Sequence, residues 1–255
     1  CAFDIETTRL PEIEQSIMYL WQFAVLLDDN EIICVYGRNW NELEELFTGI
    51  EDEHLITMIF VHNLSYEFQF LRSHIGIKPD EVFSLKPRKI LRIRAGNHMQ
   101  GNLEFRCSYM QTHKSLDKFL SDSGVENQKL KDFDYDKRRY PWTELTPKEI
   151  EYGCNDVIGL LQAMHKRLVD NNDTPLTSTG YVRREARRAM KQYNYKKLHS
   201  MMCDTSLYTL LREEFRGGDT HANRYHVGKI LNKVASFDRA SSYPDVMLNC
   251  EFPMT

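Results

Sequence analysis

The sequence predicts an α/β fold with a mixed central sheet, followed by a smaller second part of the chain. Three observations support this prediction: an early hairpin of apolar strands, an apolar strand that leads directly into a helix, and a long helix with a clear start signal. The 255 residues are enough for one large domain, or for one domain and part of another. We expect the second arrangement, because a polar stretch containing Pro175 and Gly180 has the composition of a linker.

The first half of the chain alternates strand and helix patterns. Strands are predicted at residues 1–5, 16–27 and 31–37, and the turn residues 28–30 join the last two into a hairpin. Residues 40–50 have apolar side chains at helical spacing and end near Gly49. Residues 54–61 form an apolar run of strand length, and further strands are expected at 89–96 and 102–110, before a short helix at 115–124.

A long helix is predicted to begin at Thr146. Thr146 can cap the helix, Pro147 occupies its first turn, and Glu149 stands three residues after the cap, which is the pattern of a capping box. An apolar stripe at helical spacing follows; it consists of Ile150, Cys154, Val157, Leu161, Met164 and Leu168. Tyr152 and Asp156 lie four residues apart, so they share one neighbouring face at the rim of this stripe.

The composition is that of an ordinary globular protein. Hydrophobic residues make up 42% and charged residues 27%, and the formal net charge of -4 gives no overall attraction to nucleic acid, so a nucleic-acid partner would need a local basic surface. The six cysteines lack C-x-x-C spacing, which argues against a zinc site or a disulfide framework and favours an intracellular setting. No stretch predicts a membrane span or a signal sequence. Because the sequence starts at Cys1, we expect a fragment or a trimmed chain.

Two acids, Asp4 and Glu6, stand at the end of the first predicted strand. Residues i and i+2 of a strand point to the same side, so these two carboxylates project together and repel one another. A divalent cation between them would relieve this repulsion, since hard ions such as Mg²⁺ bind carboxylate oxygens. Two solvated acids at a strand end are the alternative interpretation.

A second polar group follows the apolar strand at 54–61. His62, Asn63, Tyr66 and Phe70 surround a single acid, Glu67, where the strand gives way to a helix. Tyr66 and Phe70 are four residues apart, so their rings share one helix face and could stack on unpaired bases. Packing of both rings in the core is the alternative, and aromatic pairs at this spacing are often core residues.

Taken in order, D-I-E-T, N-x-x-Y-E and Y-x-x-x-D resemble the Exo I, Exo II and Exo III motifs of DEDD-type 3'-5' exonucleases, and the strand order resembles the ribonuclease-H-like topology of that family. The resemblance implies that four acids bind two Mg²⁺ ions, or Mn²⁺ in their place; these are Asp4, Glu6, Glu67 and Asp156. Tyr152 would orient the attacking water. The family's Exo II acid is aspartate, so Glu67 is a departure that is one methylene longer.

The end of the chain resembles protein-primed family B DNA polymerases of phages and linear mobile elements. The segment E-F-R-G-G resembles the Y-x-G-G motif that lies between the exonuclease and polymerase domains, with Phe215 in place of tyrosine. D-R-A-S-S-Y-P resembles polymerase motif A, with Ser242 in place of leucine. The resemblance spans nearly the whole chain. It implies an exonuclease domain over 1–170, a linker with a basic helix over 171–228, and the beginning of a polymerase palm over 229–255.

The same resemblance assigns further residues. Asp238 would be a polymerase metal ligand, and Tyr243 would contact the sugar of an incoming nucleotide. A catalytic lysine is expected in K-L-K-D-F-D-Y, where Lys131 is preferred over Lys129. The residues implied in nucleic-acid binding are Thr7, His62, Asn63, Tyr66, Phe70, Ser115, Leu116, Tyr135, Arg216, Gly217 and Gly218.

The implied function is proofreading of single-stranded DNA 3' ends within a polymerase. Primer-template DNA, nucleoside triphosphates and a terminal priming protein would be partners of the full-length enzyme, in the cytoplasm of a bacterial host. The sequence ends before any second polymerase carboxylate, so we expect no polymerisation by this chain. A stand-alone DEDD exonuclease and a catalytically weakened binding module remain alternatives. The basic run around Arg183, Arg187 and Lys191 is either a phosphate-binding stripe or a solvated helix face.

Overall fold

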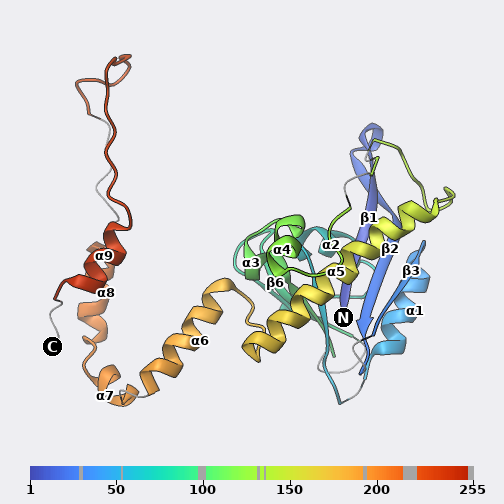
Figure 1. Cartoon of the computed structure of the whole chain (residues 1–255), viewed down its shortest axis with the longest axis horizontal. Helices are drawn as coiled ribbons and strands as arrows, with labels where there is room; N and C mark the ends of the chain where they lie inside the picture. The colour runs from blue at the N-terminus through green and yellow to red at the C-terminus, as the bar shows by residue number, and fades with distance from the viewer. Residues whose placement is uncertain are drawn as a thin grey trace. The chain divides into compact units, whose positions relative to one another are not determined.

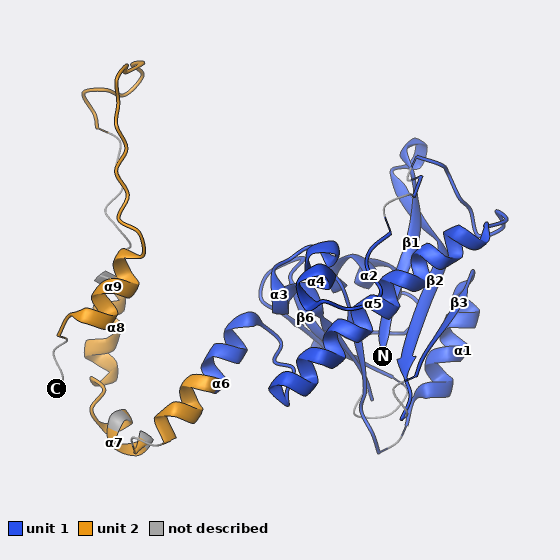
Figure 2. Ribbon diagram, viewed as in Figure 1, with its two compact units in different colours: residues 1–184 blue, residues 185–255 orange. Residues whose placement is uncertain are grey.

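The computed structural model describes residues 1–28, 31–52, 54–96, 102–130, 133–134, 136–191, 194–214 and 223–251. The chain divides into two units, residues 1–184 and 185–255, which we describe separately (Figure 2). The division falls within helix α6, Ser178–Met190. The domain bounds expected at 170 and 228 remain predictions.

A seven-stranded mixed sheet forms the centre of the first unit, in the order β3-β2-β1-β4-β7-β6-β5 (Figure 1). The strands are β1 (Ala2–Leu10), β2 (Gln15–Leu26), β3 (Ile32–Gly37), β4 (Thr57–Val61), β5 (Val82–Ser84), β6 (Ile90–Ala95) and β7 (Leu103–Cys107). β4 runs parallel to both β1 and β7, whereas the other neighbours are antiparallel. The predicted α/β fold with a mixed sheet is confirmed.

The helices of the first unit are α1 (Trp40–Ile50), α2 (Leu64–Leu71), α3 (Ser108–Thr112), α4 (Leu116–Ser123), α5 (Pro147–Asn171) and the first part of α6; short 3-10 turns occupy Pro11–Ile13 and Pro79–Glu81. α1 and α5 each begin at a side-chain cap. Asn39 accepts the backbone N–H of Glu42 at the start of α1. At the start of α5, Thr146 and Glu149 form the predicted capping box.

Two hydrophobic layers cover the sheet. Phe3 and Ile5 of β1 face the layer that contains α1 and α2, and Ala2 faces the layer that contains α4 and α5. Because side chains alternate along a strand, Asp4 and Glu6 lie on the α5 side of β1. The sheet and α5 therefore enclose the two acids that the sequence singled out.

Two local features differ from the sequence-based expectation. The strand expected to extend to residue 110 ends at Cys107, and α3 begins at Ser108. The buried Ser108 hydroxyl lies 2.9 Å from His62 Nδ1 and donates to the Val61 carbonyl at 3.3 Å, so it is tied to the end of β4 rather than continuing the β7 ladder. The short β5 had no sequence signal of its own.

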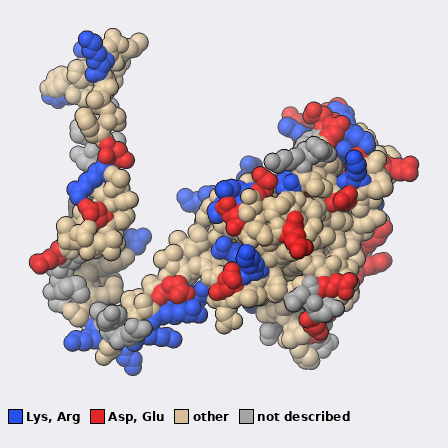
Figure 3. Space-filling model, in the orientation of Figure 1, with Lys and Arg blue, Asp and Glu red and all other residues tan. Residues whose placement is uncertain are grey.

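The second unit contains the end of α6 and the helices α7 (Tyr195–Ser200), α8 (Thr205–Glu214) and α9 (Ser242–Asn249). Several large apolar side chains of its described residues are exposed, including Ile230 and Phe237. Lys and Arg side chains gather along α6 and α7 in Figure 3. Of the helices within the described part of the chain, none has the length and apolarity needed to cross a membrane.

Candidate active site

Four acids come together where β4 ends and α2 begins. Ala2 of β1 pairs with Phe60 of β4, and β4 ends one residue later, at Val61. The segment that follows β4 therefore begins beside Asp4. Asn63 then adopts a left-handed conformation (φ 72°), which turns the chain into α2 and places Glu67 one turn inside it. α5 contributes Asp156 from above the same face of the sheet.

The pKa values of all four carboxyl groups are raised, and the charges of the cluster contribute at Asp4, Glu6 and Glu67. The pKa of Asp156 is raised by burial and by the charge of Asp117, against the lowering effect of Lys129. Burial and the charge of Asp156 raise the pKa of Asp4 to about 7. Burial and the charges of Asp4 and Asp156 raise the pKa of Glu6 to about 8. Burial and the charge of Asp4 also raise the pKa of Glu67 well above its usual value, and the Glu67 carboxyl hydrogen-bonds to Asp4. The acids are therefore close enough that their ionised forms repel one another.

Two carboxylate oxygens in this cluster have no hydrogen-bond partner among the described residues. Glu67 and Asp156 are each 3% exposed, and both Glu67 Oε2 and Asp156 Oδ1 are buried without a donor from that part of the chain. Unpartnered carboxylate oxygens beside other acids are the donor set that hard divalent cations prefer. Within the described ranges, no three His, Cys, Asp or Glu side chains already stand at the mutual distances of a metal site. The residues nevertheless fit a divalent cation chemically.

Lys129 contacts the acid cluster directly. Its Nζ donates to Asp156 Oδ2 at 2.9 Å and lies 5.6 Å from the centre of the Tyr152 ring. Burial lowers the pKa of Lys129, but the charge and hydrogen bond of Asp156 outweigh this and raise it. Tyr152 is buried and stacks on Phe133, with ring centres 4.2 Å apart. The preferred Lys131 lies outside the described residues, as does Tyr135.

The predicted base platform lies beside the acids. The hydroxyls of Thr7 and Tyr66 are 2.5 Å apart, which links the platform to the residue that follows Glu6. The Tyr66 and Phe70 rings have centres 5.4 Å apart; Tyr66 is 40% exposed, whereas Phe70 is half-buried against the core. Asn63 is exposed. The platform is thus built from one open ring and one ring shared with the core.

Three other predicted residues have local structural partners. Burial and the charge of Lys129 lower the pKa of His62 to about 4, so its ring is neutral near pH 7 and bonds to Ser108. Ser115 caps α4 by accepting the backbone N–H of Lys118 at 3.3 Å. Leu116 packs against the core beneath α5.

Sequence reasoning did not identify Gln22 as part of this region. Gln22 is the polar residue inside the apolar run of β2, pairs with Asp4 across the sheet, and is fully buried. Neither its Oε1 nor its Nε2 has a hydrogen-bond partner among the described residues. Gly153 lets α5 pack closely against the Gln22 side chain, because a Cβ at this position would lie 2.1 Å from Gln22 Nε2. The sequence signal that could have identified Gln22 was its position as a polar residue within an otherwise apolar strand.

The predicted polymerase residues lie in the second unit. Asp238 and Tyr243 are exposed, with Tyr243 on α9. Arg216, Gly217 and Gly218 lie outside the described residues. Some residues of the basic run have partners within the chain. Arg184 is half-buried, hydrogen-bonds to Asn171 and forms an ion pair with Asp173, and Arg188 forms an ion pair with Glu185. Arg183, Arg187 and Lys191 are exposed.

The fold of the chain is that of phi29 DNA polymerase structures. The ternary complex of that enzyme with primer-template DNA and incoming nucleotides matches with a TM-score of 0.67 and 17% identity, over 89% of this chain and 40% of that chain. The complex with single-stranded DNA matches with a TM-score of 0.67 and 16% identity, over 88% of this chain and 41% of that chain. The chain thus spans about two fifths of the length of these structures.

The sequence itself identifies the family. The model of the family described as DNA polymerase type B, organellar and viral, matches residues 96–255, and the chain belongs to this family. No curated protein sequence matches the chain. The resemblance to family B polymerases predicted from the motifs is confirmed.

Proposed function

We propose that the first unit is a metal-dependent 3'-5' exonuclease that removes nucleotides from single-stranded DNA 3' ends within a protein-primed type B DNA polymerase. The observation that carries this proposal is the cluster of four buried acids, in which Glu67 Oε2 and Asp156 Oδ1 have no donor among the residues that the structure describes. Burying ionised carboxylates without a cation costs free energy of folding. The exposed ring of Tyr66 lies beside the cluster and could stack on a base.

The residues that would hold two Mg²⁺ ions, or Mn²⁺ in their place, are Asp4, Glu6, Glu67 and Asp156. Bound divalent ions would activate water and stabilise the leaving oxygen of a phosphodiester. Lys129 holds Asp156 in place through its 2.9 Å ion pair and brings a positive charge to the site. Tyr152 would orient the attacking water through its hydroxyl, while its ring is fixed by Phe133. Tyr66 and Phe70 would stack on the unpaired bases next to the scissile bond.

For the second unit we propose the beginning of a polymerase palm. Asp238 would contribute to a polymerase metal site and Tyr243 would contact an incoming nucleotide, both in the full-length enzyme. Arg216, Gly217 and Gly218 would contact template DNA, and Lys131 remains a candidate beside Lys129 for the catalytic lysine. A terminal protein would prime synthesis in the cytoplasm of a bacterial host. The family membership and the motif A resemblance support this assignment.

The test is substitution of the acids in a nuclease assay. We expect Asp4→Ala and Asp156→Ala to abolish Mg²⁺-dependent shortening of a 5'-labelled single strand, because both would be metal ligands. The fold should persist, since either change relieves repulsion within the cluster. Circular dichroism and thermal unfolding check the fold, and Glu45→Ala, at an exposed acid of α1, is the matched control. Digestion by both variants at the rate of the unsubstituted protein would refute the proposal.

A weakened DNA-binding module is the second candidate. One observation favours it: Glu67 is one methylene longer than the aspartate of the Exo II motif. The same assay separates the two functions. Binding of a single strand without any Mg²⁺-dependent or Mn²⁺-dependent shortening would favour the module.

A further inference from the structure

An aromatic hollow of about 580 Å³ opens on the first unit outside the acid cluster. Four of its rings form two parallel stacks. Trp40 lies on His74 with centroids 4.1 Å apart, and Tyr140 lies on Trp142 with centroids 5.2 Å apart; the planes in each pair differ by 7°. Phe70 also lines the hollow. The proposed exonuclease function uses none of these side chains except Phe70.

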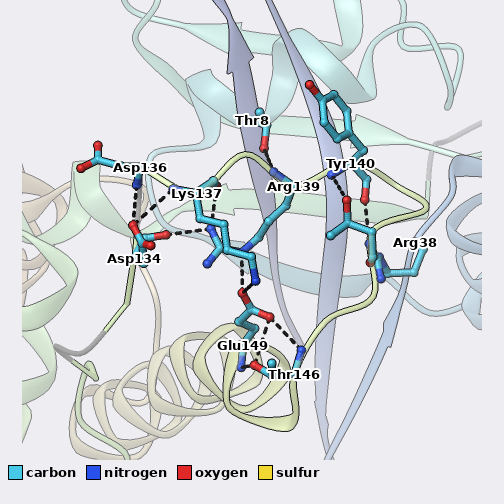
Figure 4. Close-up of polar contacts among 10 residues, drawn as sticks. Thr8, Arg38, Asp134, Asp136, Lys137, Arg139, Tyr140, Thr146 and Glu149 are labelled. Carbon is cyan, nitrogen blue, oxygen red and sulfur yellow. Dashed lines mark hydrogen bonds and ion pairs between the residues drawn. The ribbon is translucent and has the colours of Figure 1, made fainter.

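The turn that carries Trp142 is fixed by hydrogen bonds at its two ends. The Tyr140 N–H donates to Thr143 Oγ1 and the Thr143 N–H donates to the Tyr140 carbonyl, both at 2.9 Å. The Arg38 guanidinium donates to the carbonyls of Tyr140 and Thr143, both at 2.8 Å (Figure 4). Trp142 itself is 79% exposed. A large apolar ring held in the open on a rigid support loses little conformational entropy on binding a ligand.

The residue before this turn anchors it to the sheet and to α5. The Arg139 backbone N–H donates to Thr8 Oγ1 at 3.0 Å, and its guanidinium donates to Glu149 at 2.8 Å (Figure 4). Arg139 is buried. The position of Trp142 is therefore set by β1, by β2 and β3 through Arg38, and by the start of α5.

The hollow contains the positive charge of Arg38. Its guanidinium bonds to the carbonyls of Tyr19, Tyr140 and Thr143 and forms no ion pair with a carboxylate of the described residues. The nearest acid is Glu42, whose carboxylate accepts the Arg38 backbone N–H at 2.9 Å and whose charge, with that of Glu149, acts on Arg38 from a distance. Gln69 and Ser73 add polar groups to the lining. Aromatic rings beside a positive charge are the combination that binds unpaired nucleotides, because every base has a face for stacking and every phosphate is negative.

A line of contacts joins the hollow to the acid cluster. Thr7, next to Glu6, contacts the Tyr66 hydroxyl at 2.5 Å. Tyr66 contacts Phe70 with ring centres 5.4 Å apart, and Phe70 forms part of the wall of the hollow. A strand whose 3' end lies at the acids and whose neighbouring bases stack on Tyr66 would be directed toward this wall.

We propose that the hollow is a second binding site for unpaired bases of single-stranded DNA, with Trp142 as its exposed stacking ring. This inference rests on the proposed function, because it places the 3' end of the same strand at the acid cluster. The site takes bases several nucleotides upstream of that end. It would lengthen the single-stranded segment held during digestion without contacting the reacting phosphate.

Strand length separates this site from the acid cluster in a binding experiment. Fluorescence anisotropy in EDTA, which prevents metal-dependent digestion, measures the affinity of the whole chain for labelled oligothymidylates of about three and about twelve nucleotides. We expect Trp142→Ala to raise the dissociation constant of the long strand about 5- to 100-fold and to change that of the short strand less than about twofold. Trp142→Phe, which keeps a ring, should retain most of the affinity for the long strand.

Tyr36→Ala is the matched control, because Tyr36 is an exposed ring on β3 that does not line the hollow. It should leave both affinities unchanged, and thermal unfolding should confirm that each variant is folded. Unchanged affinity of Trp142→Ala for the long strand would overturn the proposal and leave the turn as a contact for a protein partner. Equal weakening for both lengths would also overturn it. Full digestion by Asp4→Ala would refute the exonuclease while leaving a length-dependent loss in Trp142→Ala as support for this site.

Discussion

Glu67 is the residue at which this chain departs from the Exo II pattern, and its length matters for the chemistry of the acid cluster. Its carboxyl is buried and bonds to Asp4, and its Oε2 has no donor within the described part of the chain. We expect Glu67→Asp to raise turnover, because the shorter side chain restores the ligand length that the family uses. The gain should be larger with Mg²⁺ than with Mn²⁺, since Mg²⁺ demands near-ideal octahedral geometry. Steady-state digestion of a single strand with each ion measures it.

The control for this prediction is Glu67→Ala, which removes the carboxyl and should be inactive with both ions. A lower turnover of Glu67→Asp with both Mg²⁺ and Mn²⁺ would show that the site is built around the longer acid.

At the same scale, the preference for Lys131 stays a prediction, because Lys131 lies outside the described residues, and the contact of Lys129 with Asp156 had no sequence signal. Two lysines stand two residues apart, and no periodic pattern governs an irregular segment. Contacts of Asn127 hold the segment that carries Lys129 in place. The Asn127 backbone N–H donates to Gln162 at 3.2 Å, and the Asn127 side chain donates to Asn155 at 2.7 Å. Both partners lie on α5, so the segment is attached to this helix beside Asp156. Such long-range side-chain bonds leave no local signal.

At the scale of elements, Glu149 performs two tasks at the start of α5. It closes the capping box with Thr146, and it accepts hydrogen bonds from Lys137 and Arg139 at 2.8 Å each (Figure 4). Burial alone would raise its pKa, but the bonds from Lys137, Thr146 and Arg139 lower the pKa from 4.5 to about 2. The segment that carries Arg139 is therefore fastened to the same residue that begins the helix.

This network predicts a specific pH dependence of stability. An acid whose pKa is lower in the folded chain stabilises the fold above its ordinary pKa, and that contribution is lost as the pH falls toward the folded value. Glu149→Gln should lower the free energy of unfolding by about 2 kcal/mol at neutral pH, and the difference should shrink between pH 5 and pH 2. Urea unfolding across this pH range measures both effects.

The control for this prediction is Glu151→Gln, which changes an exposed acid of the same helix and should be near neutral. A Glu149→Gln deficit that stays constant down to the lowest pH would show that the charge of Glu149 is not what stabilises the segment.

The elements that sequence predicted well have strong local signals. α1 occupies the predicted residues 40–50, and α5 begins at the predicted capping box. α3 and β5 were not predicted, because five and three residues are too few to show a period. α3 is instead set by bonds of Ser108 to Val61 and His62, which are distant in sequence.

At the scale of the whole molecule, the candidate site depends on strand order. The acids at 4, 67 and 156 meet because β4 lies parallel to β1 and α5 crosses the same face (Figure 1). The sequence predicted that strand, junction and helix each carry an acid, and the resemblance to exonucleases predicted that they meet. Hydrophobic patterns alone could not establish that meeting, since strand pairing across about 60 residues leaves no periodic trace.

Binding of a divalent cation should stabilise the whole first unit. A ligand that binds only the folded chain at about 100 times its dissociation constant adds about 2.7 kcal/mol to the free energy of unfolding. For a unit of this size that corresponds to a rise in melting temperature of about 5 to 10 °C. We expect MgCl₂ to produce such a rise, because cations relieve the repulsion among Asp4, Glu6 and Glu67. Calorimetry of the full chain measures it.

Two comparisons make this prediction specific to the acid cluster. KCl at matched ionic strength should raise the melting temperature much less, because screening acts weakly on buried groups. Asp156→Asn should lose most of the Mg²⁺-dependent rise, since it removes one ligand and leaves the amide unable to replace a charged oxygen. An equal rise in Asp156→Asn would place the stabilising ion elsewhere on the protein. Loss of the rise together with loss of digestion would connect the stability of the fold to the four acids proposed as metal ligands.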